Sequence, residues 1–366
     1  MDSRALLEDI IKDLSADNLI RFFRDKSRAF APKQESLAHY NDEYFKEGLK
    51  LGEISFSDGQ KLIVCAFKAG QELTERSGKK AQYDKAKKIL KEMQVFSVGI
   101  FVFYDKNGSF RFSLVYPESM GTRRQWSNFR RFTYYVSKEL TNKTFIQRVG
   151  SGDFSSIDNI KDAFSVDKVT NKFFEEFREV FEKTKQEFEK SNKNTACLWL
   201  KDRYSDEDYK EQLNKFTFTF LGRIIFLYFL LRKGWIENKK DYIRKIVEDK
   251  SISTLYINIF QPLFFDVFAK KESERPAEIK KQYADTPYLN GGLFERSDLE
   301  SSMEKVGIMI LFSDLFIRNI ILNYFEAYNF TIDENSPDDQ EVSIDPEMLG
   351  KVFENTLAEE EMEKKG

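Results

Sequence analysis

The spacing of the apolar residues changes near residue 150, and this change limits what the chain can fold into. Before that point the apolar runs are short and alternate with polar residues, as in β-strands. After about residue 155 they recur every three or four residues, as on one face of an α-helix. We therefore predict an α+β protein with a mixed α/β domain over residues 1–150 and an all-α domain over residues 151–366.

Residues 1–150 have the sequence pattern of two pairs of strands that are joined by a helix. Alternation in one run, an Asp58-Gly59 turn signal and a β-rich second run together predict an antiparallel hairpin. A basic helix and two further strands follow, the strands joined by a turn that contains Asn-Gly. With helices before residue 47, the predicted order is α–β–β–α–β–β. The predicted elements are strands Leu51–Ser57 and Lys61–Ala69, helix Gly78–Met93, and strands Phe96–Tyr104 and Ser109–Tyr116.

The second part is predicted to be a bundle of long helices. Val166–Lys190 has Phe and Glu at helical spacing, and Tyr209–Lys233 becomes so apolar that it should be the buried centre of the bundle. Leu299–Tyr328 predicts another long helix or a pair of helices. The Gly291-Gly292 pair lacks the residues of a phosphate-binding loop, so we interpret it as a turn that docks the following Leu293 and Phe294 into a core.

Composition excludes several classes of protein. Two Cys and one His in 366 residues cannot build a disulfide framework or a multi-histidine metal centre. The N-terminal segment has no basic stretch followed by an apolar stretch, so it does not resemble a secretory signal. The most apolar run contains Arg223 and is too short for a typical membrane span. These features predict a cytoplasmic protein that does not enter a membrane.

The predicted hairpin resembles the core of metal-dependent nucleases of the PD-(D/E)XK type. Such enzymes hold magnesium with carboxylates from two adjacent strands, and a Lys two residues after the second carboxylate helps to position the attacking water. Lys68 has the place of that Lys, and Glu53 or Asp58 can supply the first acid and bind the metal. The second acid is replaced by Ala66. Glu72 or Glu75 could reach the site from a different backbone position.

Two basic stretches make the first 150 residues electrostatically polarised, although the whole chain has a formal charge of only −3. Lys68–Lys91 has eight basic and three acidic residues, and Arg123–Arg148 has seven basic residues and one acid among aromatic side chains. Such surfaces suit the phosphate backbone of DNA, to which Arg and Lys give affinity without reading sequence. The candidate DNA-binding residues are Arg76, Lys79, Lys80, Arg123, Arg124, Arg130 and Arg131.

Three segments together resemble type IIG restriction–modification enzymes, which are single chains that combine a nuclease with an N6-adenine DNA methyltransferase. The segments are Phe220–Leu230 with Lys233-Gly234-Trp235, Tyr288–Glu295 and Ile344–Asn355. In that family they precede the methyltransferase domain. The resemblance is closer over residues 210–366 than over the first 150, where the family has its PD-(D/E)XK nuclease.

The resemblance implies that residues 1–150 form a nuclease-like hydrolase domain and that residues 151–366 form a helical connector leading into a methyltransferase domain. Double-stranded DNA would be the substrate, and magnesium would be the cofactor of an active nuclease site. S-adenosylmethionine would bind only the methyltransferase domain, which lies with the target-recognition domain outside these residues.

Two alternatives remain open at the level of the sequence. A degenerate nuclease domain could clamp DNA for the methyltransferase without cutting it, because Ala66 replaces an expected acid. A scaffold that binds other proteins through its acidic C-terminal stretch and Phe-rich helices would not need nucleic acid at all. Steep salt dependence of DNA binding would separate the last hypothesis from the other two.

Overall fold

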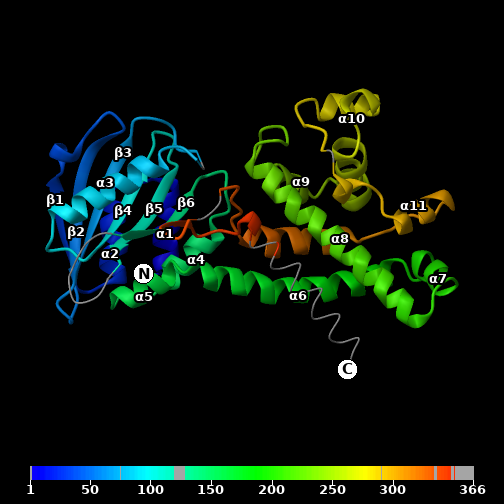
Figure 1. Cartoon of the computed structure of the whole chain (residues 1–366), viewed down its shortest axis with the longest axis horizontal. Helices are drawn as coiled ribbons and strands as arrows, with labels where there is room; N and C mark the ends of the chain where they lie inside the picture. The colour runs from blue at the N-terminus through cyan, green and yellow to red at the C-terminus, as the bar shows by residue number, and fades with distance from the viewer. Residues whose placement is uncertain are drawn as a thin grey trace. The chain divides into compact units, whose positions relative to one another are not determined.

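The computed structural model describes residues 2–74, 76–118, 128–289, 291–333, 336–347 and 350. The chain forms two compact units (Figure 1). Unit 1 is Met1–Asn171 together with Asp333–Leu349, and the body of unit 2 is Lys172–Ile332. The boundary predicted at residue 150 differs from this division, because two short helices after residue 142 pack in unit 1 and because a late segment of the chain returns to it.

Unit 1 is built on a seven-stranded mixed sheet whose spatial order is the same as its order in the chain. Neighbouring strands are antiparallel except for the parallel pairs β3–β4 and β6–β7. The strands are β1 (Phe30–Ser36), β2 (Phe45–Ser55), β3 (Lys61–Ala69), β4 (Val98–Tyr104), β5 (Phe110–Pro117), β6 (Phe129–Val136) and β7 (Asp339–Glu341).

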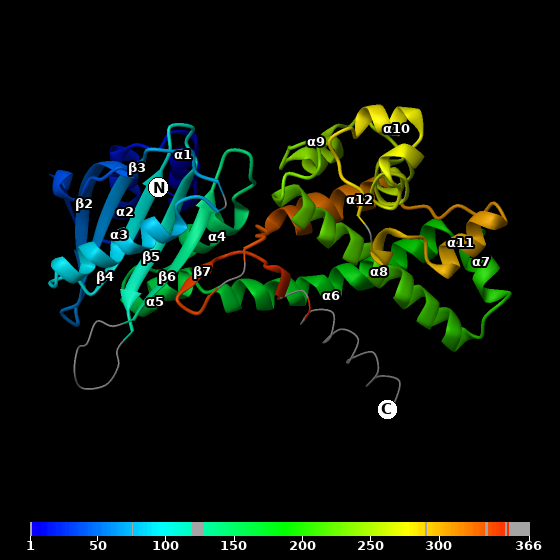
Figure 2. The ribbon, with the colours of Figure 1, turned by 45° about the horizontal axis from the view of Figure 1, so that its top comes forward.

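Helices cover both faces of this sheet (Figures 1 and 2). On one face, α3 (Lys79–Glu92) packs through Ala86, Ile89 and Leu90 on a core that includes Phe67 and Phe103. On the other face, Phe112 of β5 contacts aromatic rings from α2 (Ala16–Lys26) and α4 (Lys143–Ser151). The helices of unit 1 are α1 (Ser3–Lys12), α2 (Ala16–Lys26), the 3-10 turn η1 (Ala38–Tyr40), α3 (Lys79–Glu92), α4 (Lys143–Ser151) and α5 (Ile157–Ala163).

The central elements of unit 1 were predicted from their periodicity, and three strands were missed. β3, α3, β4 and β5 lie within about two residues of their predicted bounds, whereas β2 begins at Phe45, six residues before the predicted start at Leu51. β1 has six exposed residues out of seven and a register shift after Pro32, so it lacks the alternation that marks a half-buried strand. β6 has a basic sequence, and β7 is only three residues long, so neither was predicted as a strand.

Unit 2 is helical, as predicted, and its interior is aromatic. Phe312 stacks on Phe220 with ring centroids 4.7 Å apart, and Phe216, Tyr256 and Phe316 surround the same ring. The longer helices are α6 (Val166–Ser191), which begins in unit 1, α7 (Ala196–Lys201), α8 (Asp206–Arg232), α9 (Tyr242–Glu248), α10 (Ala277–Gln282), α11 (Asp298–Lys305) and α12 (Asp314–Asn319). Shorter π and 3-10 turns are η2 (Tyr256–Phe260), η3 (Leu263–Phe268), η4 (Glu272–Glu274), η5 (Gly292–Phe294), η6 (Ile320–Tyr324) and η7 (Phe325–Ala327).

The apolar helix α8 is the central helix of unit 2. By length and composition it could cross a membrane, but 72% of its most apolar window is buried within the structure. That burial is typical of the core helix of a globular unit. Of the two possibilities predicted over Leu299–Tyr328, one long helix or a pair of helices, the structure has the pair, because an extended stretch separates α11 from α12.

Candidate functional site

Lys68 lies at the end of β3 and pairs with a carboxylate that the sequence did not single out. Its Nζ lies 2.8 Å from Oε1 of Glu47, and both side chains remain substantially exposed. Glu47 occupies an irregular position near the start of β2, where the register shifts between Lys46 and Leu49 and where the φ of Glu47 is +51°. The hydrogen bond and the charge of Glu47 raise the pKa of Lys68. Lys68 is therefore a firmly protonated cation beside one accessible carboxylate.

The predicted metal ligands Glu53 and Asp58 do not lie beside Lys68. Glu53 is paired in register with Ile63, five residues before Lys68 on β3, which is roughly 16 Å along a strand. Its carboxylate binds Lys50 at 2.6 Å and Lys61 at 3.6 Å. Asp58 lies in the turn and accepts hydrogen bonds from Gln60. The physical reason is the antiparallel pairing, because the end of β3 meets the beginning of β2 and not the turn that joins the two strands.

The other described residues proposed for this site do not bring a second acid to Lys68. Ala66 is buried opposite Leu49, and Phe67 packs in the core beneath α3, so Ala66 and Lys68 share the opposite face of the strand. Glu72 is exposed in the loop after β3, where its backbone carbonyl accepts a hydrogen bond from Ser77. Glu75 lies outside the described residues. Among the residues that the structure describes, no three His, Cys, Asp or Glu side chains are grouped to hold a metal ion.

The predicted DNA-binding residues are distributed between exposed and buried positions. Lys80 is exposed, Arg76 is largely exposed, and Lys79 is only 22% exposed. Arg130 is partly exposed and pairs with Glu118. Arg123 and Arg124 lie outside the described residues. Arg131 is 1% exposed, so in this conformation its guanidinium does not face solvent where a phosphate could bind.

Three of these predicted DNA-binding residues, Arg76, Lys79 and Arg131, pair with acidic residues that lie within residues 333–341. Arg131 donates from Nε and Nη2 to the two carboxylate oxygens of Asp339, at 2.8 and 2.6 Å. Lys79 binds Glu341 at 2.8 Å and Asp333 at 2.6 Å, and Arg76 binds Asp333 at 2.9 Å. We call Asp333 and Ser336–Glu341 the acidic segment. Its many acids were evident in the sequence, but their pairing with residues more than 200 positions earlier was not.

Arg223 of α8 joins two of the segments that carried the family resemblance. Its guanidinium forms a fork with the carboxylate of Glu300, at 2.8 and 3.0 Å. It also donates to the backbone carbonyls of Leu293 and Glu295, at 2.7 and 2.8 Å. Phe294 between them is buried, as predicted, whereas Leu293 is exposed. These segments therefore form a structural connection within unit 2.

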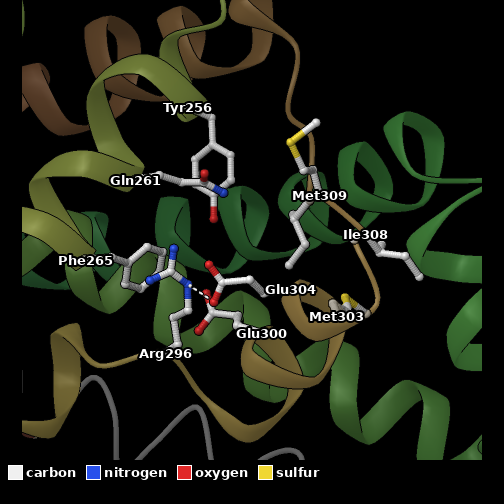
Figure 3. Close-up of a pocket in the computed structure, with 11 residues that line it drawn as sticks. Tyr256, Gln261, Phe265, Arg296, Glu300, Met303, Glu304, Ile308 and Met309 are labelled. Carbon is white, nitrogen blue, oxygen red and sulfur yellow. Dashed lines mark ion pairs between the residues drawn. The ribbon is translucent and has the colours of Figure 1, made fainter.

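A cavity of about 300 Å³ lies beside this connection in unit 2 (Figure 3). The buried Tyr256 lines it together with Gln261. Arg296 pairs with Glu304 at 3.1 Å and lies over the ring of Phe265. The described residues that line it do not include a nucleophile beside a base.

Comparisons with known proteins give two partial matches. Residues 170–343 match a domain of unknown function, DUF7814, which spans nearly all of unit 2 and continues through the acidic segment. The chain is also 31% identical over 212 residues to a protein of Methanocaldococcus jannaschii named "Putative type II restriction enzyme and methyltransferase RM.MjaORFECS2P". That alignment covers 53% of this chain and 17% of the relative. No solved structure matches the chain significantly.

Proposed function

We propose that this chain is part of a restriction–modification protein and that unit 1 binds duplex DNA and cleaves it. The observation that carries the proposal is the similarity to a relative whose name combines a restriction enzyme with a methyltransferase. The aligned part is a small fraction of that relative. A single-chain type IIG arrangement, with an N6-adenine methyltransferase beyond these residues, is the form that the resemblance of the three segments favours.

The local geometry supports Lys68 and Glu47 as the cleavage site of this proposal. They lie at adjoining ends of neighbouring strands, where a carboxylate and a lysine of a PD-(D/E)XK site are expected. Both side chains are accessible. Glu47 thereby takes the role that sequence reasoning assigned to Glu53 or Asp58.

This site offers magnesium one carboxylate, which is the smallest number of protein carboxylates that commonly hold this ion. Magnesium in phosphoryl-transfer sites is commonly held by one or two carboxylates together with substrate phosphates and water. Glu47 supplies one carboxylate, and Ala66 leaves the second position without an acid. When bound, the metal would lower the pKa of water and neutralise charge on the phosphate.

The residues of the chain would then have distinct roles. Glu47 would hold the metal, and Lys68 would orient the attacking water and stabilise the negative charge that develops on the phosphate oxygens. Because Lys68 keeps its proton in the ion pair with Glu47, it would act as an electrostatic group and not as a general base.

Cleavage of duplex DNA by the full-length protein tests this assignment. We expect Lys68→Ala and Glu47→Gln each to lower the magnesium-dependent rate by roughly 100-fold, because each removes a charge from the reacting centre. Lys61→Ala is the matched control, since Lys61 begins the same strand and pairs with a different acid. It should leave the rate within about threefold of the unchanged protein.

The same experiment separates the competing assignments. A large loss of cleavage in Glu53→Gln with none in Glu47→Gln would restore the metal site predicted from the sequence. DNA binding without cleavage in magnesium or manganese would instead identify unit 1 as a non-catalytic clamp. Affinity for DNA that hardly falls with salt would remove the phosphate-contact proposal altogether.

A further inference from the structure

The acidic segment returns to unit 1 after the whole of unit 2 and binds three cations there. Arg76, Lys79 and Arg131 all pair with its carboxylates. Two of these cations come from the stretch around α3, and the third comes from β6. One short segment thus neutralises residues from both basic stretches.

Burial makes these contacts different from ordinary surface ion pairs. Arg131 and Glu341 are almost completely buried, and Nη1 of Arg131 has no hydrogen-bond partner in the described residues. Desolvation lowers the pKa of Lys79, but Glu341 and Asp333 outweigh it and raise that pKa overall. Without the acidic segment, these cations would require another source of negative charge.

Hydrogen bonds from a buried arginine hold the loop that carries Arg76 and leads into Lys79. The guanidinium of Arg111 on β5 is buried, and it donates to the backbone carbonyls of Thr74 and Ser77 at 2.6 and 2.8 Å. These carbonyls belong to the loop that carries Arg76 and leads into Lys79. The position of the loop is therefore fixed partly by Arg111 of β5 and not only by the acidic segment.

The carboxylates of the acidic segment bind the three cationic side chains with the geometry that phosphates would use. The two-bond fork between Arg131 and Asp339 is the geometry with which Arg also binds phosphate. Lys79 lies between two carboxylates, as a lysine can lie between successive backbone phosphates. The segment is attached at the edge of the sheet, where the three residues of β7 pair with β6 and two further backbone hydrogen bonds join Asp338 to Arg131 and Val342 to Thr133.

We propose that Arg76, Lys79 and Arg131 form a phosphate-binding surface for DNA and that the acidic segment is an internal competitor for it. The segment covers the surface in the absence of DNA, and its displacement exposes the three cations to the phosphate backbone. This inference rests on the proposed DNA-binding function and adds its regulation. It concerns binding, and it is independent of the assignment of Lys68 and Glu47.

Neutralising the acidic segment in the full-length protein is the first test. In the variant Asp333→Asn/Asp339→Asn/Glu341→Gln we expect duplex DNA to bind about tenfold more tightly at low salt. The slope of log affinity against log salt should steepen by about two to three, because up to three more phosphates would be contacted. The control Glu8→Gln/Asp17→Asn/Asp158→Asn makes the same charge change at exposed positions of unit 1. It should not change the slope.

A reversible crosslink tests the displacement directly, even if the neutralised variant does not fold. Phe132 of β6 and Gln340 of β7 are register partners, so Phe132→Cys/Gln340→Cys can form a disulfide that fixes the acidic segment. The two native cysteines are buried. We expect the oxidised variant to bind DNA about tenfold more weakly than the same variant after reduction. The reduced sample controls for the loss of the Phe132 side chain.

The outcomes distinguish this inference from the proposed function. Equal DNA affinity in the oxidised and reduced crosslink variant, with steep salt dependence in both, would overturn the competitor and leave DNA binding intact. The competitor would also be overturned if the neutralised variant kept its thermal stability and bound DNA like the unchanged protein. Absence of salt-dependent DNA binding in every protein, including the neutralised variant, would overturn the proposed function itself.

Discussion

Arg223 shows how one charged residue can organise an apolar unit. It interrupts the most apolar run of the sequence, yet it is 1% exposed and has a carboxylate and two carbonyls as partners. A buried charge is tolerated only when its hydrogen-bonding capacity is used in this way. Arg223, whose charge disfavours a membrane span in the sequence, therefore also connects α8 to the segment before α11.

We expect Arg223→Met to destabilise unit 2 by about 3–5 kcal/mol, because it leaves the carboxylate of Glu300 and two carbonyls buried without their donor. Urea unfolding followed by tryptophan fluorescence would measure this change. Lys215→Ala on the same helix is the control, since its pair with Glu211 is exposed and should contribute less than about 1 kcal/mol. Equal unfolding midpoints for the two variants would refute the structural role of Arg223.

The extended stretch between α11 and α12 shows how a break between two helices is stabilised. The sequence predicted one long helix or a pair of helices here, and the stretch that separates the pair is held by the side chain of the residue that follows α6. Asn192 accepts a hydrogen bond from the N–H of Leu311 at 2.8 Å and donates to its carbonyl at 2.9 Å. This amide imitates a strand partner, so the backbone is satisfied without a helix.

Replacing that amide should weaken the element that depends on it. We expect Asn192→Ala to cost about 1–3 kcal/mol, because partly buried backbone groups of Leu311 lose their partner. Hydrogen exchange should show faster exchange at the N–H of Leu311 than in the unchanged protein. Asn194→Ala, at a nearby exposed position, should have little effect on either measurement. Unchanged exchange in Asn192→Ala would show that the amide does not hold the stretch.

Across the molecule, several carboxylates are stabilised in their charged form by the fold. A hydrogen bond from Lys50 is the main cause that lowers the pKa of Glu53. Burial opposes the shift at Asp42 and Glu187, but hydrogen bonds outweigh it and lower both pKa values. The folded chain therefore releases these protons at a lower pH than the unfolded chain does.

These shifts predict a loss of stability in acid. A carboxyl with a lowered folded-state pKa adds stability above its ordinary value of about 4, and this stability is lost as the pH falls through the folded value. Urea unfolding midpoints should thus be similar at pH 7 and 6 and fall steadily below about pH 4.5. In Glu53→Gln the decline should be smaller. A midpoint that rises on acidification would contradict the direction of all three shifts.

Local sequence patterns predicted the order of the central strands and helices of unit 1, the helical nature of unit 2 and the buried centre formed by α8. These features follow from local periodicity, which each segment carries independently of the others. Alternation also placed Lys68 and Ala66 on one face of β3, and the resemblance to PD-(D/E)XK nucleases marked Ala66 as the position of an expected acid. The resemblance to restriction–modification enzymes rested on local segments as well.

Which charged side chains pair with one another could not be predicted from the sequence, because the pairs depend on the fold. Antiparallel pairing brought Glu47 to Lys68 and kept Glu53 and Asp58 away, and the return of the chain placed Asp339 on Arg131. The strand β7 is too short to be recognised from its own pattern, and it is ordered by partners distant in the sequence. Local periodicity specifies an element and its buried face, whereas contacts between distant charges depend on register and on the path of the whole chain.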